Sequence, residues 1–174
     1  MIILHSVQKL LNTSRLEAAL YISKPHPGQR LHSWYARLLP SGFPGKMMVM
    51  YVHEPSLMVV ICKGKTIQGT WPDFRVRLEQ LLSRFRFPAT FIKDELAYAD
   101  EYIVSKTGSR SMLAFMNRIV FELSYQCSQF PDYDSISLTR LEDWLMDRLH
   151  QTGKKQGDYS SPLKYWQREI GFAS

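Results

Sequence analysis

Two short apolar segments separated by three residues constrain the fold of this chain more than any other feature. Residues 46–53 (KMMVMYVH) and 57–63 (LMVVICK) are apolar almost throughout and contain several β-branched side chains, which is typical of buried strands. Only Glu54, Pro55 and Ser56 lie between them, so the pair is predicted to form an antiparallel hairpin. Because neither segment alternates with polar residues, we expect both faces of the sheet to be covered, with helices on at least one side.

Other segments show helical or strand patterns in an irregular order. Amphipathic or capped helices are predicted over residues 73–87, 88–98, 109–129 and from Ser137 onward. Further strands are predicted near residues 2–4, 32–39 and 101–106. Because strands and helices do not alternate regularly, the sequence predicts an α+β fold, a small, largely antiparallel sheet with helices packed against it, in a single domain. We expect that domain to span residues 1–152, followed by a linker and a docking C-terminal tail over residues 153–174.

The cysteines and the apolar segments indicate the compartment. A chain of 174 residues can bury about 70% of its unfolded surface and needs no disulfide to fold. Cys62 and Cys127 lie far apart in apolar surroundings, so we interpret them as buried free thiols of a reducing compartment. No segment is apolar enough to span a membrane, and the first residues lack the pattern of a signal peptide. We therefore expect a cytoplasmic protein without membrane contacts, and the sequence does not indicate its oligomeric state.

The common catalytic and cofactor motifs are missing from the sequence. The five histidines do not have the spacing of metal ligands, so neither a metal nor another cofactor is expected. Residues 63–66 resemble the end of a phosphate-binding loop, but Val59 occupies the position of its first glycine. There is also no G-x-S-x-G elbow of a serine hydrolase. These absences favour a protein that is not an enzyme.

Residues 106–117 form the strongest candidate for a binding site. They join a predicted strand to the start of the long predicted helix, where free backbone N–H groups and the helix dipole favour an anion. The residues expected to bind an anion or a partner are Lys106, Thr107, Ser109, Arg110, Ser111 and Asn117. In the alternative interpretation, Ser109 or Ser111 only caps the helix, Arg110 pairs with a carboxylate of the fold and Asn117 satisfies backbone groups.

A basic surface is the second indication of function. The net charge is +6 and the isoelectric point is near 9.4, a balance that attracts nucleic acid or acidic protein surfaces. The residues considered as surface contacts are Lys9, Trp34, Tyr35, Arg75 and Arg86. The alternative is that the aromatic residues pack in the core and that the arginines form a solvated rim beside the apolar stripe of their helix.

Residues 106–117 also resemble the K-T-x-x-R-S-x-L-x-x-M-N signature of a bacterial domain family of unknown function. Residues 4–11 (LHSVQKLL) are similar to its opening L-H-x-T-x-K-L-L, residues 34–38 (WYARL) to its W-Y-A-N-L, and residues 49–57 to its hairpin. The chain departs from the family pattern at Gln8, Arg37, His53 and Ala114. The resemblance covers roughly residues 2–125. It implies a bacterial, phage or plasmid origin and a cytoplasmic protein, and it supplies no activity.

Three functions from different classes remain open. The first is a non-enzymatic interaction or regulatory module of a bacterial or mobile-element system, with a protein partner. The second is a nucleic-acid-binding protein that uses Lys106, Arg110 and the arginines around residues 73–87. The third is a metal-independent, ribonuclease-like toxin in which His5, Lys9, Lys106 and Arg110 supply proton transfer and charge stabilisation.

Overall fold

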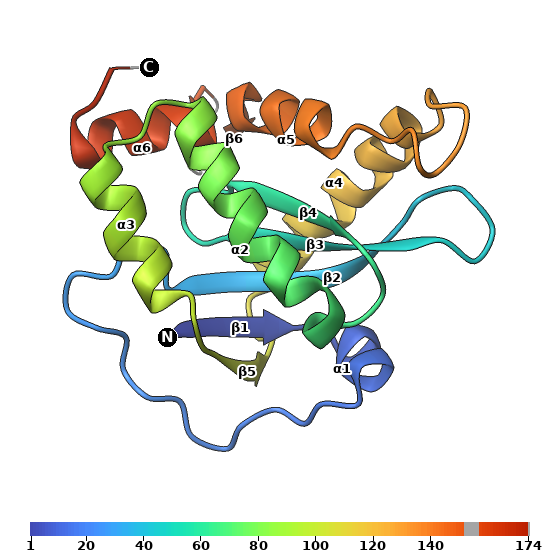
Figure 1. Cartoon of the computed structure of the whole chain (residues 1–174), viewed down its shortest axis with the longest axis horizontal. Helices are drawn as coiled ribbons and strands as arrows, with labels where there is room; N and C mark the ends of the chain where they lie inside the picture. Colours follow the sequence, from blue (N-terminus) through green and yellow to red (C-terminus); the bar gives the residue numbers. More distant parts are fainter. Residues whose placement is uncertain (152–156, 174) are drawn as a thin grey trace.

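A five-stranded sheet forms the centre of the protein (Figure 1). The computed structural model describes residues 1–151 and 157–173. The strands are β1 (Ile2–Ser6), β2 (Ser33–Pro40), β3 (Met47–His53), β4 (Val59–Lys63) and β5 (Tyr102–Lys106), and they lie in the order β4-β3-β2-β1-β5. A separate pair of two-residue strands joins β6 (His150–Gln151) to β7 (Tyr159–Ser160).

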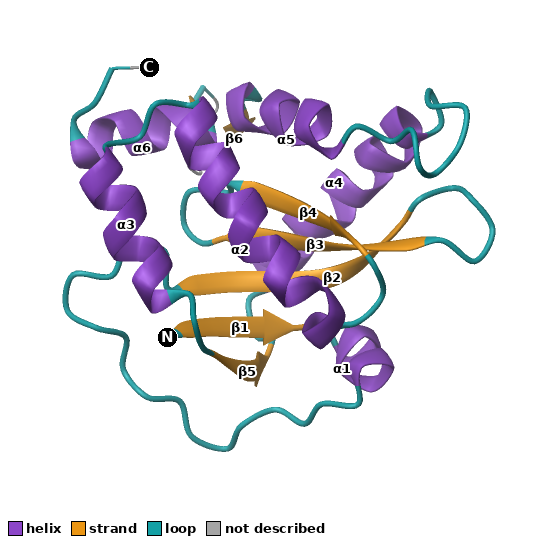
Figure 2. Ribbon diagram, viewed as in Figure 1, coloured by secondary structure: helices purple, strands orange, loops and turns teal. Residues whose placement is uncertain are grey.

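Helices cover both faces of this sheet (Figure 2). They are α1 (Gln8–Ser14), α2 (Ile67–Arg84), α3 (Ala89–Tyr98), α4 (Arg110–Cys127), α5 (Leu138–Asp147) and α6 (Pro162–Ile170). Helices α2 and α3 lie on one face, and α4 crosses the other. The α+β single-domain prediction is therefore confirmed. None of the described helices is long and apolar enough to cross a membrane.

The sheet is mixed, so the prediction of a largely antiparallel sheet is wrong. Strands β2, β3 and β4 are antiparallel neighbours, with Met50 opposite both Arg37 and Ile61, as the hairpin pattern predicts. Strand β1, however, lies parallel to both β2 and β5. Parallel neighbours need long crossover connections rather than tight turns. Such pairings leave no local signal, and the sequence therefore revealed only the antiparallel half.

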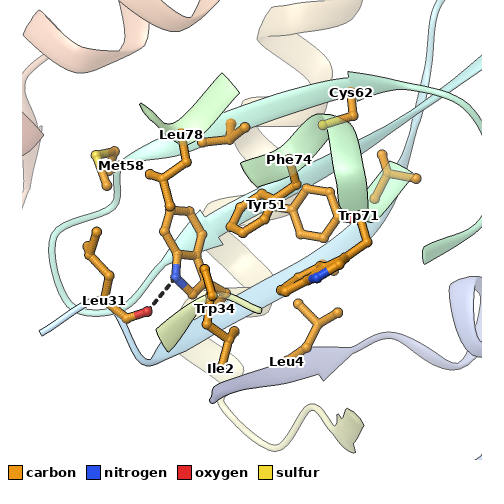
Figure 3. Close-up of a cluster of buried hydrophobic side chains, with 14 of the residues drawn as sticks. Ile2, Leu4, Leu31, Trp34, Tyr51, Met58, Cys62, Trp71, Phe74 and Leu78 are labelled. Carbon is orange, nitrogen blue, oxygen red and sulfur yellow. Dashed lines mark hydrogen bonds between the residues drawn. The ribbon is translucent and has the colours of Figure 1, made fainter. Parts of the chain in front are cut away.

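Alternation along β2 divides its side chains between two cores. Trp34 faces α2 and is fully buried, and its indole Nε1–H donates to the Leu31 carbonyl at 2.9 Å. Figure 3 shows Trp34 beside Tyr51 and Phe74 in this core. Tyr35 faces α4 and is 5% exposed. Trp34 is therefore a core residue and not a surface contact, because a fully buried indole cannot reach a partner.

Helix α2 begins six residues earlier than the pattern of residues 73–87 predicts. The Thr66 side chain caps it by accepting from Gly69 N–H at 3.1 Å, and Pro72 lies inside the helix. Proline costs a helix one hydrogen bond, yet α2 continues through it. Burial of Trp71 and Phe74 against the sheet offsets that cost.

The C-terminal helix α6 packs on the main fold. Trp166 is 2% exposed, and its ring lies 5.4 Å from that of His53 and 5.6 Å from that of Phe91. The expected linker begins at residues 153–156, which lie outside the described residues, so the division after residue 152 stays a prediction. Cys62 and Cys127 are both buried and free.

Candidate functional site: two pockets beside helix α4

Helix α4 separates two pockets. On one side, a groove of about 290 Å³ runs between α1 and α4; we call it the α1–α4 groove. It is lined by Val7, Lys9, Arg37, Leu38, Pro40, Met47, Leu113, Asn117 and Val120. On the other side lies a pocket of about 580 Å³, which we call the Glu54–Arg118 pocket. It is lined by Glu54, Pro55, Leu57, Ser111, Met112, Ala114, Phe115, Arg118 and Gln151.

A half-buried cation lies in the α1–α4 groove. Arg37 comes from β2, and its guanidinium donates a hydrogen bond to the side-chain oxygen of Asn117. Burial lowers the pKa of Arg37 from its ordinary value, yet an arginine stays charged in proteins. No acidic side chain pairs with Arg37 in the part of the chain that the structure describes. The groove therefore holds an oriented positive charge that no acid neutralises.

Two further cations belong to the same side of the molecule. Lys9 is exposed and lines the groove. Arg110 is exposed and lies seven residues before Asn117 on α4, which places both on one stripe of the helix. Across residues 1–151 and 157–173, neither cation forms an ion pair. The interpretation that Arg110 pairs with an acid of the fold therefore fails.

The other predicted residues of the 106–117 segment have different roles. One caps α4, and the others line a pocket, are half-buried or are exposed. Ser109 caps α4 by accepting from Met112 N–H at 3.3 Å, and its oxygen lies 3.0 Å from that of Ser111. Ser111 lines the Glu54–Arg118 pocket. Thr107 is half-buried, and its hydroxyl has no partner among the described residues. Lys106 is exposed at the end of β5. The segment thus contributes to both pockets and does not form one compact site.

The lining of the Glu54–Arg118 pocket includes a carboxylate. Glu54 lies in the β3–β4 turn close to the Tyr35 hydroxyl, which also lies near Ser109. Burial, together with the negative charge of Glu54, raises the pKa of Tyr35 to about 12. The His5 ring stacks on Tyr35 at 4.7 Å, and burial lowers the pKa of His5. Tyr35 is thus a buried, neutral group close to Glu54.

The lining of that pocket also includes a guanidinium. Arg118 lies over the Phe115 ring at 5.4 Å, and its Nη2 is 3.2 Å from His150 Nδ1. Burial, with the nearby charges of Arg118 and Arg148, lowers the pKa of His150 to about 4. A neutral His150 accepts from Arg118 without cancelling its charge. Among the described residues, no His, Cys, Asp and Glu cluster could hold a metal ion.

The three arginines of α2 all pair with acids of the fold rather than being free for a ligand. Arg77 forms two hydrogen bonds with the buried Glu142, at 2.9 and 2.7 Å. Arg84 pairs with Asp143 at 2.9 Å. Arg75 lies 2.5 Å from an oxygen of Asp100. Arg86, which follows the helix, is exposed, and no ion pair involves it within the described ranges.

Several site residues escaped the sequence analysis. Arg37 is a departure from the asparagine of the family pattern, and that departure was the available signal. Phe115 and Arg118 share one helix face with the predicted Ser111, but only the fold shows that Glu54 lines the same pocket. His150 carried no signal at all, because its contact with Arg118 joins positions 32 residues apart.

Comparison with known proteins places the chain in a family. Residues 3–165 match the model of a domain of unknown function, DUF6933. No curated protein matches the chain. The match extends from β1 into α6 and thus includes both pockets. The protein belongs to the DUF6933 family.

Proposed function

We propose that the protein is a non-enzymatic interaction module that binds an acidic segment of a partner protein in the α1–α4 groove. The observation that carries this proposal is the Arg37 guanidinium, which is half-buried and oriented by Asn117 but has no acidic partner within residues 1–151 and 157–173. A partly desolvated charge forms stronger hydrogen bonds with a carboxylate than an exposed one does. A ligand carboxylate would therefore gain most of its affinity at Arg37, with Lys9 and Arg110 adding attraction at the rim.

The floor of the groove favours a peptide over nucleic acid. Its apolar lining comes from Val7, Leu38, Pro40, Met47, Leu113 and Val120. No aromatic ring is among the described lining residues, whereas sites for single-stranded nucleic acid commonly stack bases on aromatic side chains. An apolar floor with a positive rim matches a segment that has both acidic and aliphatic side chains. Nucleic acid is the second candidate, supported by the net charge of +6.

The origin and the location of the protein are part of the same proposal. The two buried free cysteines support a reducing compartment such as the cytoplasm. The resemblance of residues 106–117 to a bacterial signature supports a bacterial or mobile-element system. The partner is then a protein of the same cell.

A selection from a library of random peptides displayed on phage tests this proposal. We expect wild-type protein to enrich sequences that combine Asp or Glu with aliphatic residues. The same sequences should be lost when Arg37→Met is the bait, because methionine keeps the apolar stem and removes the charge. Lys93→Met is the matched control, since Lys93 is an exposed lysine on α3, across the sheet from the groove.

Two results would contradict the proposal. One is enrichment of peptides without any excess of acidic residues. The other is retention of the acidic peptides by the Arg37→Met bait. A thermal unfolding curve of each bait shows that the variants are folded, and single-stranded DNA added as a competitor shows whether nucleic acid occupies the same groove.

A further inference from the structure

The lining of the Glu54–Arg118 pocket combines two opposite charges with apolar side chains. Glu54 comes from the β3–β4 turn and Arg118 from α4, and both line the same cavity of about 580 Å³. That volume is in the range of small-molecule sites. No ion pair joins the two, and neither pairs with another charged side chain in the described part of the chain. The pocket therefore presents two unneutralised charges to whatever enters it.

Each of these charges has a neutral group beside it. The Glu54 carboxylate lies close to Tyr35, whose pKa of about 12 keeps its hydroxyl protonated at neutral pH. The Arg118 guanidinium contacts His150, whose pKa of about 4 keeps the imidazole uncharged. A neutral neighbour leaves the charge of Glu54 or Arg118 available. The contact with His150 also orients Arg118, and preorganisation of this kind lowers the entropic cost of binding a ligand.

Much of the remaining lining is apolar. It includes Pro55, Leu57, Met112 and the Phe115 ring, over which Arg118 lies. A ligand with a single charge would pair with one of the two charged side chains and leave the other without a partner. A ligand with both charges on an apolar body would pair with both and cover the apolar lining.

We propose that this pocket binds a small apolar zwitterion, a free aliphatic or aromatic amino acid or its dipeptide, with the ligand ammonium at Glu54 and the ligand carboxylate at Arg118. The Ser111 hydroxyl, which also lines the pocket, can donate to the same carboxylate. This site is independent of the α1–α4 groove, because α4 lies between them and Glu54 and Arg118 do not line the groove. The ligand would be a small-molecule effector of the interaction module.

Titration of the ¹⁵N-labelled protein followed by NMR tests the proposal. The probes are L-leucine, L-phenylalanine and the dipeptide Leu-Leu, which distinguish a single residue from a dipeptide. We expect at least one of them to cause saturable shifts at Leu57, Ser111 and Met112. N-acetylation removes the ligand cation and C-amidation removes its anion, so each blocked form of that ligand should bind about tenfold more weakly or worse.

Paired variants assign each end of the ligand. Arg118→Gln should remove the preference for the free carboxylate, whereas Arg118→Lys should retain part of it. Glu54→Gln keeps the shape of the side chain and should remove the preference for the free ammonium. Lys93→Met should leave affinity unchanged. The proposal is overturned if none of the three zwitterions binds, if both blocked forms bind as tightly as the free ligand, or if the shifts map outside the pocket.

Discussion

Arg37 on β2 donates a hydrogen bond to the side-chain oxygen of Asn117 on α4, across 80 residues of sequence. The bond joins the sheet to the helix that crosses it and orients the guanidinium in the α1–α4 groove. Because the acceptor is a neutral amide, the positive charge remains available. This arrangement makes the groove a candidate for an acidic ligand.

Replacing Asn117 with aspartate tests the role of that free charge. Asn117→Asp keeps the shape of the side chain and gives Arg37 an ionic partner. We expect stability to change by less than about 1 kcal/mol, because ion pairs near the surface contribute little. We also expect affinity for acidic peptides to fall about tenfold or more, because one charge-assisted hydrogen bond is lost. Fluorescence anisotropy and thermal unfolding measure the two effects.

The matched control adds the same charge elsewhere. Gln80 is exposed on α2, on the opposite face of the sheet. Gln80→Glu changes the net charge by the same amount and should leave peptide affinity nearly unchanged. Equal losses in the two variants would indicate a general electrostatic effect and would count against a specific groove.

Glu142 is the buried acid on which the contact between α2 and α5 depends. It accepts from Arg77 at 2.9 and 2.7 Å and from the Ile61 N–H at 3.0 Å. Glu142→Gln leaves Arg77 without its charged partner, so we expect a loss of about 3–5 kcal/mol in the free energy of unfolding. Glu79→Gln, at an exposed position of α2, should cost less than about 0.5 kcal/mol. Urea denaturation followed by circular dichroism measures both; similar losses would contradict the role of Glu142.

His53 makes stability depend on pH. Its ring is fully buried, accepts from or donates to Ser56 at 2.7 Å and contacts the Arg30 carbonyl at 3.0 Å. Burial lowers the pKa of His53 to about 3, whereas the unfolded chain binds a proton near pH 6.5. The free energy of unfolding should therefore fall as the pH is lowered from about 6.5 towards 3, because only the unfolded chain takes up that proton.

Removing the titrating ring isolates this contribution. His53→Asn lowers stability overall, but its stability should decline less steeply in that pH range, by up to about 1.4 kcal/mol per pH unit relative to wild type. Urea titrations at several pH values measure the slope. Identical slopes for the two proteins would show that His53 is protonated in the folded state as easily as in the unfolded chain.

Both cysteines should be unreactive in the folded protein. Cys62 and Cys127 are fully buried, and burial raises the pKa of each thiol. Since the thiolate is the reactive form, a colorimetric thiol reagent should label neither at neutral pH and both in denaturant. Rapid labelling of Cys127 in the native protein would show that the α4 end of the core opens readily.

The local parts of the fold could be predicted from sequence, and the long-range parts could not. Continuous apolar runs identify β3 and β4, and Ser137 marks the start of α5, where its side chain accepts from Arg140 N–H. The position of β1 between two parallel neighbours depends on crossovers that leave no periodic signal. Trp34 and Tyr35 are adjacent in sequence, yet they face opposite cores because side chains alternate along a strand.

The candidate site shows the same division. The basic residues Lys9 and Arg110 could be named from composition and spacing. Arg37 could not, because its importance comes from its contact with Asn117 and from the lack of an acid nearby among the described residues. Pairing decides whether an arginine is free to bind, and the structure shows that Arg77 and Arg84 are paired.

The binding of a fluorescein-labelled peptide of alternating glutamate and leucine, measured by anisotropy as salt is varied, tests the proposed function most directly. We expect saturable binding that weakens with salt, a loss of about tenfold or more in Arg37→Met, and no more than about a twofold change in Lys93→Met. Absence of binding to the wild type, or equal affinity of the wild type and Arg37→Met, would contradict an acidic-ligand groove centred on Arg37.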